Sequence, residues 1–97
     1  MERNIFREAI GVLKTKGWTK GQYQTYDGCC CLVGACAEAA GSESPGDFER
    51  TDAHQFLENM LYKTYARRSI TNWNDNQASV DPVIALLEKT ADAWDAR

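Results

Sequence analysis

The chain has 97 residues, of which 43% are hydrophobic and 26% are charged, and its formal net charge at pH 7 is −3. This length fits one domain over residues 1–97, and the composition is ordinary for a soluble globular protein. A membrane span is excluded because no apolar run approaches roughly 18 residues, and no secretory signal is visible, so we expect a cytoplasmic protein.

The sign of the charge alternates along the chain. Basic residues dominate residues 1–22 and 61–68, and acidic residues dominate residues 23–60 and 69–97. A nucleic-acid-binding domain usually carries one basic stripe, which this alternation does not produce. We therefore expect neither nucleic acid nor a membrane as the partner.

The first predicted element is an amphipathic helix over residues 3–16. Its apolar residues recur at helical spacing from Ile5 to Leu13, and charged residues fall on the opposite face. Gly17 is a typical helix stop, and Trp18 is expected to cover the helix end. The following residues contain two glycines and predict a loop, with room for a short β-hairpin near residues 22–27.

The second predicted helix covers residues 28–40, and between Cys29 and Ala40 its only charged residue is Glu38. A helix that is apolar almost all round belongs inside a protein, so we expect the other helices to pack around it. Asp27 is the expected N-cap. The cysteines are too close together to join distant segments and are predicted to be free thiols, of which Cys31 is the most exposed. They are Cys29, Cys30, Cys31 and Cys36.

The second half of the chain predicts two more helices. A single helical turn can start at Ser44 and Pro45, and Thr51 or Asp52 then caps a helix over residues 52–67. Residues 69–79 are rich in Asn, Asp and Ser, which predicts an ordered loop. We expect the side chains of Ile70 and Trp73 to anchor this loop to the rest of the protein. Asp81-Pro82 starts the last helix, over residues 81–95. The predicted fold is a mainly α, compact four-helix single domain.

Three short motifs follow one another along the chain. They are Gly17-Trp18, then a glycine-rich approach to Cys31-Leu32-Val33-Gly34-Ala35, then Trp73-Asn74-Asp75 before the last helix. With these motifs the chain resembles a family of small proteins of unknown function from actinobacteria and their bacteriophages, and the resemblance spans most of the chain. It implies a bacterial or phage cytoplasmic origin and supplies no catalytic residues.

The cysteines and His54 are soft metal ligands, but their spacing does not fit a zinc site. Structural zinc uses cysteine pairs on turns with a second pair well separated, whereas every cysteine here lies on one predicted helix. Buried free cysteines behave as small hydrophobic residues. We therefore expect no metal and no other cofactor.

Thiol catalysis is the alternative that these residues leave open. Cys29 or Cys30 at the start of the predicted helix would have the lowered pKa that a nucleophile needs. A base is also required, and His54 is the only histidine. The alternative function is a small enzyme, or a metal or thiol site, that uses such a cysteine or the Trp73-Asn74-Asp75 segment.

Two further groups favour structural over binding roles. Trp73-Asn74-Asp75 could hold a ligand or a metal, but Asn and Asp before a helix more often bond to nearby backbone. Lys63, Arg67 and Arg68 lie near the end of the third predicted helix, where the helix dipole itself favours cations. The first group therefore needs no ligand to explain it, and the second needs no nucleic acid.

Aromatic residues make up 10% of the chain, which is more than a small helical core easily hides. Tyrosine can pack its ring while showing its hydroxyl to water, and such residues form interface hot spots. We therefore expect a non-catalytic cytoplasmic interaction protein that binds an unidentified protein, a host protein if the chain is phage-encoded. The predicted interaction residues are Tyr23, Tyr26, Tyr62, Tyr65, Trp73, Asn74 and Asp75.

Overall fold

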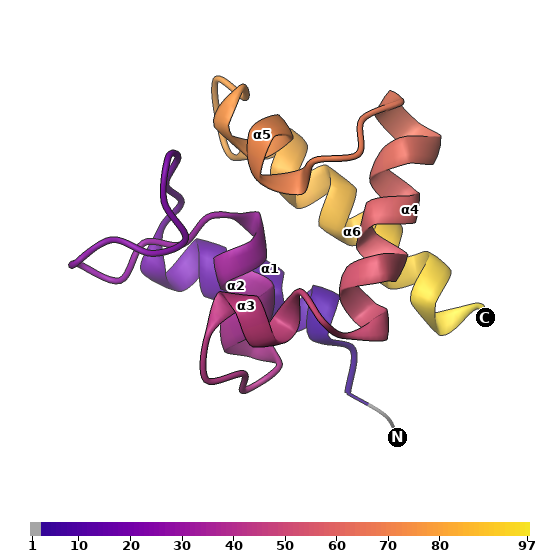
Figure 1. Ribbon diagram of the computed structural model, residues 1–97, viewed down its shortest axis with the longest axis horizontal. Coiled ribbons are helices and arrows are strands. Elements are labelled where there is room, and N and C mark those ends of the chain that lie inside the picture. Colours follow the sequence, from indigo (N-terminus) through magenta and orange to yellow (C-terminus); the bar gives the residue numbers. More distant parts are fainter. Residues whose placement is uncertain (1–2) are drawn as a thin grey trace.

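The computed structural model describes residues 3–97. Over these residues the fold consists of six helices and contains no strand. The mainly helical single domain is confirmed, but the four-helix count is wrong because two short helices are added. The helices are α1 (Ile5–Lys16), α2 (Leu32–Ala39), α3 (Pro45–Phe48), α4 (Asp52–Tyr65), α5 (Ile70–Asp75) and α6 (Asp81–Asp95) (Figure 1).

Helix α1 forms where its apolar stripe and its caps predict it. The Asn4 side chain accepts hydrogen bonds from the backbone N–H groups of Phe6 and Arg7, which satisfies two of the free donors at the helix start. At the other end Gly17, with φ of 96°, donates its N–H to the Leu13 carbonyl. This backbone conformation favours glycine, and it ends the helix where the sequence predicts.

Helix α2 begins at Leu32 and not near residue 28, so the predicted start and the Asp27 cap are wrong. The backbone of Cys30 is held in an extended conformation instead, because its N–H donates to Gly17 (2.9 Å) and its carbonyl accepts from Thr19 (3.0 Å). These bonds to the loop replace the bonds that a helix would supply. The cap is the Cys31 thiol, whose sulfur accepts from Gly34 N at 3.4 Å.

The predicted hairpin near residues 22–27 is also absent. Gln24 forms an isolated bridge with Cys30, and Trp18 pairs with Cys30 from the other side. The segment that links α1 to α2, residues 17–31, is therefore an ordered loop that wraps around one extended residue. In Figure 1 it lies on the left, away from both chain ends.

The helices are arranged as two groups that α1 joins. Helix α2 packs against α1, α3 and α5, and seven of its eight residues are buried. Helix α4 packs mainly against α6, and α1 contacts α6 as well as α2 (Figure 1). We expected one helix surrounded by all the others. Instead α2 is the buried centre of one group, and α1 connects it to the pair formed by α4 and α6.

The elements after α2 follow the predictions in part. Ser44 caps the predicted turn as α3, and Thr51 caps α4, which ends at Tyr65 two residues before the predicted end. The predicted ordered loop is wrong, because α5 forms within it and is capped by Ser69. Too short to be stable alone, α5 depends on the burial of Ile70 and Trp73, the two residues expected to anchor this segment.

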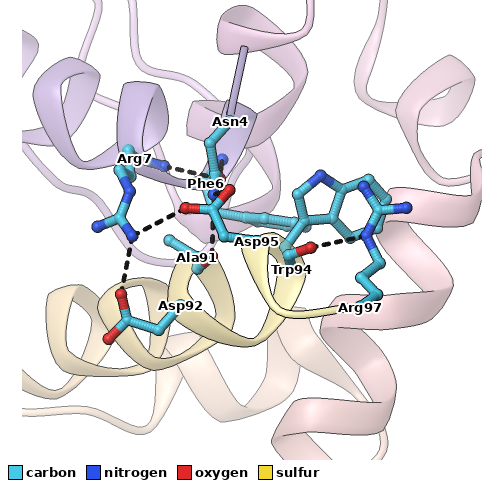
Figure 2. A network of polar contacts seen from close by, with 8 residues as sticks. All are labelled: Asn4, Phe6, Arg7, Ala91, Asp92, Trp94, Asp95 and Arg97. Carbon is cyan, nitrogen blue, oxygen red and sulfur yellow. Dashed lines mark hydrogen bonds and ion pairs between the residues drawn. The ribbon is translucent and has the colours of Figure 1, made fainter. Parts of the chain in front are cut away.

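Polar contacts fasten the start of α1 to the end of α6 (Figure 2). Asn4 Nδ2 donates to the Ala91 carbonyl at 2.9 Å and to Asp95 Oδ1 at 3.0 Å. Arg7 donates to Asp92 at 2.8 Å and to Asp95 at 3.1 Å. These contacts hold the two ends of the described chain together. Within the described part of the chain, no helix is both long enough and apolar enough to cross a membrane.

Candidate functional site

A buried asparagine joins the three motifs noted in the sequence, although they lie far apart along the chain. Asn74 is 0% exposed, and its Oδ1 accepts from Trp18 Nε1 at 2.8 Å and from Leu32 N at 3.2 Å. Its Nδ2 donates to the Thr19 carbonyl at 3.2 Å and to Asp75 Oδ1 at 3.1 Å. We call these five residues the Asn74 junction. It connects α5 to the loop and to the first turn of α2.

Two more contacts fix the loop against this junction. Asp75 Oδ1 accepts a hydrogen bond from Gly21 N at 2.8 Å. The carbonyl of Tyr23 lies directly against α2 at Gly34, where a Cβ would stand only 2.1 Å from the carbonyl oxygen. Only glycine leaves room for this approach. The glycine of the second motif is therefore required by packing against the loop.

An open pocket of about 250 Å³ lies between the loop and α5. The loop forms one wall and α5 forms the other, and the residue before α2, Cys31, also belongs to the lining. We call it the α5 pocket, and its lining residues are Gly21, Gln22, Tyr23, Cys31, Thr71 and Asp75. Of these, the sequence singled out Tyr23, Cys31 and Asp75 and missed Gly21, Gln22 and Thr71. No chemical signature in the sequence marks these three residues.

The four cysteines are free, as predicted, but the expected order of exposure is wrong. Cys31 is only 2% exposed and its thiol caps α2, whereas Cys29 is half-buried. Burial, and then the hydrogen bond to Glu38, raise the pKa of the Cys30 thiol to about 11. Burial also raises the pKa of Cys31 and of Cys36. These three thiols are therefore protonated at neutral pH.

His54 lies apart from the α5 pocket. Its ring meets Phe48 edge to face, with centroids 5.8 Å apart, and its Nδ1 lies 3.6 Å from Glu58. His54 is not among the residues that line the pocket with Cys31 and Asp75. In the described part of the chain no three His, Cys, Asp or Glu side chains are grouped as metal ligands would be.

Two of the predicted interaction residues form an exposed aromatic surface on α4. Tyr62 and Tyr65 are 47% and 42% exposed, and they are neighbours on the helix because they are three residues apart. The guanidinium of Arg68 lies 4.2 Å from the ring centre of Tyr62, and the Tyr65 ring lies 5.0 Å from that of Trp73. We call Tyr62, Tyr65 and Arg68 the tyrosine surface.

The other predicted interaction residues have different surroundings. Tyr23 is 39% exposed and its hydroxyl donates to Glu49 at 3.1 Å, while Tyr26 is fully exposed on the loop. Trp73 and Asn74 are buried, 6% and 0% exposed, and contact the protein's own residues. That any of these residues contacts a partner stays a prediction.

Comparisons with known proteins identify one family. A family model described as "Family of unknown function (DUF6197)" matches residues 2–93. No curated protein and no solved structure matches the chain.

Proposed function

Since the chain belongs to DUF6197, a family of unknown function, we propose a function from its surface: a non-catalytic interaction protein that binds a partner protein through the tyrosine surface. The observation that carries this proposal is the pair of half-exposed rings on α4. Each ring already has a neighbour on one side, Arg68 for Tyr62 and Trp73 for Tyr65. Fewer rotamers are then lost on binding, which lowers the entropic cost of forming an interface.

The residue types of the tyrosine surface also support binding. Tyrosine and arginine are enriched among the residues that carry most of the energy of protein interfaces. Lys63 and Arg67 lie close to Tyr62 and Arg68 in sequence and are exposed. A partner surface with acidic groups complements this charge, and such complementarity speeds encounter and excludes wrong partners.

Three of the four thiols are poorly suited to nucleophilic catalysis. A nucleophilic cysteine needs a lowered pKa, whereas burial raises the pKa of Cys30, Cys31 and Cys36. The candidate base, His54, does not line the pocket that contains Cys31. The resemblance to proteins of actinobacteria and their phages adds the setting to the proposal: the bacterial cytoplasm, with a host protein as the partner if the chain is phage-encoded.

The test is capture of a partner from native cytoplasmic extract with the full chain as bait. We expect Tyr62→Ala to weaken capture of the same partner about thirtyfold, because truncating a hot-spot residue costs about 2 kcal/mol or more. The affinity of each variant for the captured protein is then measured with purified components. Circular dichroism of each variant confirms that the helices are retained.

The proposal narrows the predicted interaction residues to the tyrosine surface, which leaves out Tyr26. Tyr26→Ala is therefore the matched control, because it removes a tyrosine that is exposed but lies on the loop and not on α4. This variant should bind the partner as the unchanged chain does. Equal capture by the unchanged chain, Tyr62→Ala and Tyr65→Ala would refute the proposed surface. Failure of the unchanged chain to retain any protein would refute the proposed function.

A further inference from the structure

The α5 pocket is preorganised, because hydrogen bonds within the protein fix its walls in the absence of a ligand. Gly21 N is held by Asp75 Oδ1 at 2.8 Å, and the Tyr23 carbonyl accepts from Cys31 N at 3.0 Å. The Asn74 junction holds the adjoining backbone. Because its walls are bonded to the body of the protein, the pocket keeps its shape without a ligand, which lowers the cost of binding.

Among the residues that line the pocket, Asp75 is the one that has a carboxylate side chain. Its Oδ1 accepts from Gly21 and Asn74, and no side chain within residues 3–97 forms an ion pair with it. Lys20, which precedes the lining residue Gly21, donates instead to the Gln77 carbonyl at 3.0 Å and lies outside the lining. The pocket therefore offers a negative charge that no cation of the described protein neutralises by direct contact.

The size of the pocket limits what can fill it. Pockets for drug-sized molecules measure about 300–1,000 Å³, and this one measures about 250 Å³. The lining also includes the polar residues Thr71 and Gln22, and Tyr23 and Cys31, whose side chains are largely apolar. A short chain with one charged end matches this volume and this mixture better than a large or anionic molecule does.

We propose that the α5 pocket binds one cationic group, an ammonium or a guanidinium on a short aliphatic chain, with Asp75 as its counter-ion. Such a group occurs on small free amines and on the side chains of lysine and arginine, and the two sources share the chemistry that the pocket recognises. The site is distinct from the tyrosine surface. It can therefore be tested whether or not the proposed partner exists.

The probes are n-butylammonium and n-propylguanidinium, with n-butanol as the neutral analogue. Binding is followed by the backbone amide NMR shifts of Gly21, Thr71 and Asp75 in the full chain. We expect saturable shifts with both cations, with a dissociation constant on the order of 1 mM because the probes have few atoms. We expect n-butanol to bind at least about tenfold more weakly, since it cannot pair with a carboxylate.

The decisive variant is Asp75→Asn, which keeps an Oδ1 acceptor for Gly21 but removes the charge. It should weaken cation binding about tenfold or more. Asp81→Asn removes an exposed carboxylate at the start of α6, outside the pocket, and should bind as the unchanged chain does. If Asp75→Asn perturbs the fold, Thr71→Leu provides a second test, because added bulk in the lining should also weaken binding.

A further probe separates the two sources. Tighter binding of Nα-acetyl-lysine methylamide than of n-butylammonium supports the proposal and assigns the pocket to a side chain of a peptide or protein. The reverse order supports the proposal and assigns it to a free amine. The proposal is overturned if n-butanol shifts the same amides as strongly as the cations do, if Asp75→Asn leaves cation binding unchanged, or if no probe binds.

Discussion

Two glycines inside helices have opposite roles in this molecule. At Gly34 in α2, an added Cβ would lie 2.1 Å from the Tyr23 carbonyl oxygen, a backbone atom that cannot turn aside. At Gly11 in α1, the same added atom would meet nothing within 4 Å. The first glycine is fixed by packing, whereas the second only increases the flexibility of the unfolded chain.

Substitution by alanine should therefore change stability in opposite directions at these two sites. Gly34→Ala should lower the free energy of unfolding by about 1–3 kcal/mol or more, because the loop must move away from α2. Gly11→Ala should raise it by about 0.5–1 kcal/mol, because alanine favours the helix. Urea denaturation measures both. A similar loss of stability in the two variants would contradict the placement of the loop on α2.

The buried thiols make the free energy of unfolding depend on pH in the alkaline range. The ordinary pKa of a cysteine is 9.0, and burial raises that of Cys30 to about 11 in the folded protein. Below pH 9 the thiol is protonated in both states, so its contribution to stability is complete. Between about pH 9 and pH 11 the unfolded chain loses this proton while the folded chain keeps it, so stability falls as the pH rises.

Cys30→Ser isolates this effect, because its hydroxyl does not titrate in this range. The difference in unfolding free energy between the unchanged chain and Cys30→Ser should shrink from pH 8 to pH 11, as measured by urea denaturation at each pH. A constant difference across this range would show that Cys30 has an ordinary pKa and is not held in the interior.

At the scale of elements, Asn74 connects α5 to the loop and to α2. Asn74→Ala would leave the Trp18 indole N–H and the Leu32 N–H without their acceptor. Each buried donor without a partner costs about 1–3 kcal/mol, so the variant should lose at least about 2 kcal/mol of stability. Calorimetry or urea denaturation gives the value.

Asn72→Ala is the control on the same helix. Asn72 is exposed, and its side chain contacts only its neighbour Asn76 among the hydrogen bonds of the described residues. Its loss should change stability by no more than about 0.5 kcal/mol, as is usual for surface sites. Equal losses in the two variants would contradict the special role of Asn74.

The elements that could be predicted from the sequence are those whose signals are local. Helices α1, α4 and α6 start and end within about two residues of the predicted positions, because apolar stripes and caps lie within each helix. The start of α2 and the existence of α5 depend on partners far along the chain. Cys30 is extended because residues 17 and 19 bond to it, and α5 is stable because Trp73 and Asn74 are buried.

The candidate site could be predicted to a similar extent. The Trp73-Asn74-Asp75 motif drew attention to the segment that borders the α5 pocket, because its residue types fit either a ligand or a backbone contact. Its partners could not be found, because Gly21 and Thr71 carry no chemical signature of their own. The predicted exposure of Cys31 was also wrong, since it followed from a helix that was predicted to start four residues too early.

At the scale of the whole molecule, α1 lies between the two groups of helices and contacts both. Phe6 of α1 packs edge to face on Trp94 of α6, with ring centres 5.4 Å apart, and Trp94 packs likewise on Phe56 of α4 at 5.0 Å. On its other side α1 packs against α2. We therefore expect the two groups to unfold together, with the loop held to the body by the Asn74 junction.

Native-state hydrogen exchange of the loop tests this account most directly, because its central claim is that the junction fixes the loop to the body. The indole N–H of Trp18 and the amides of Cys30, Cys31 and Leu32 should exchange only through global unfolding, with a free energy equal to that from urea denaturation. Exchange of these protons at a free energy well below the global value would contradict the account, because the loop and its pocket would then open on their own.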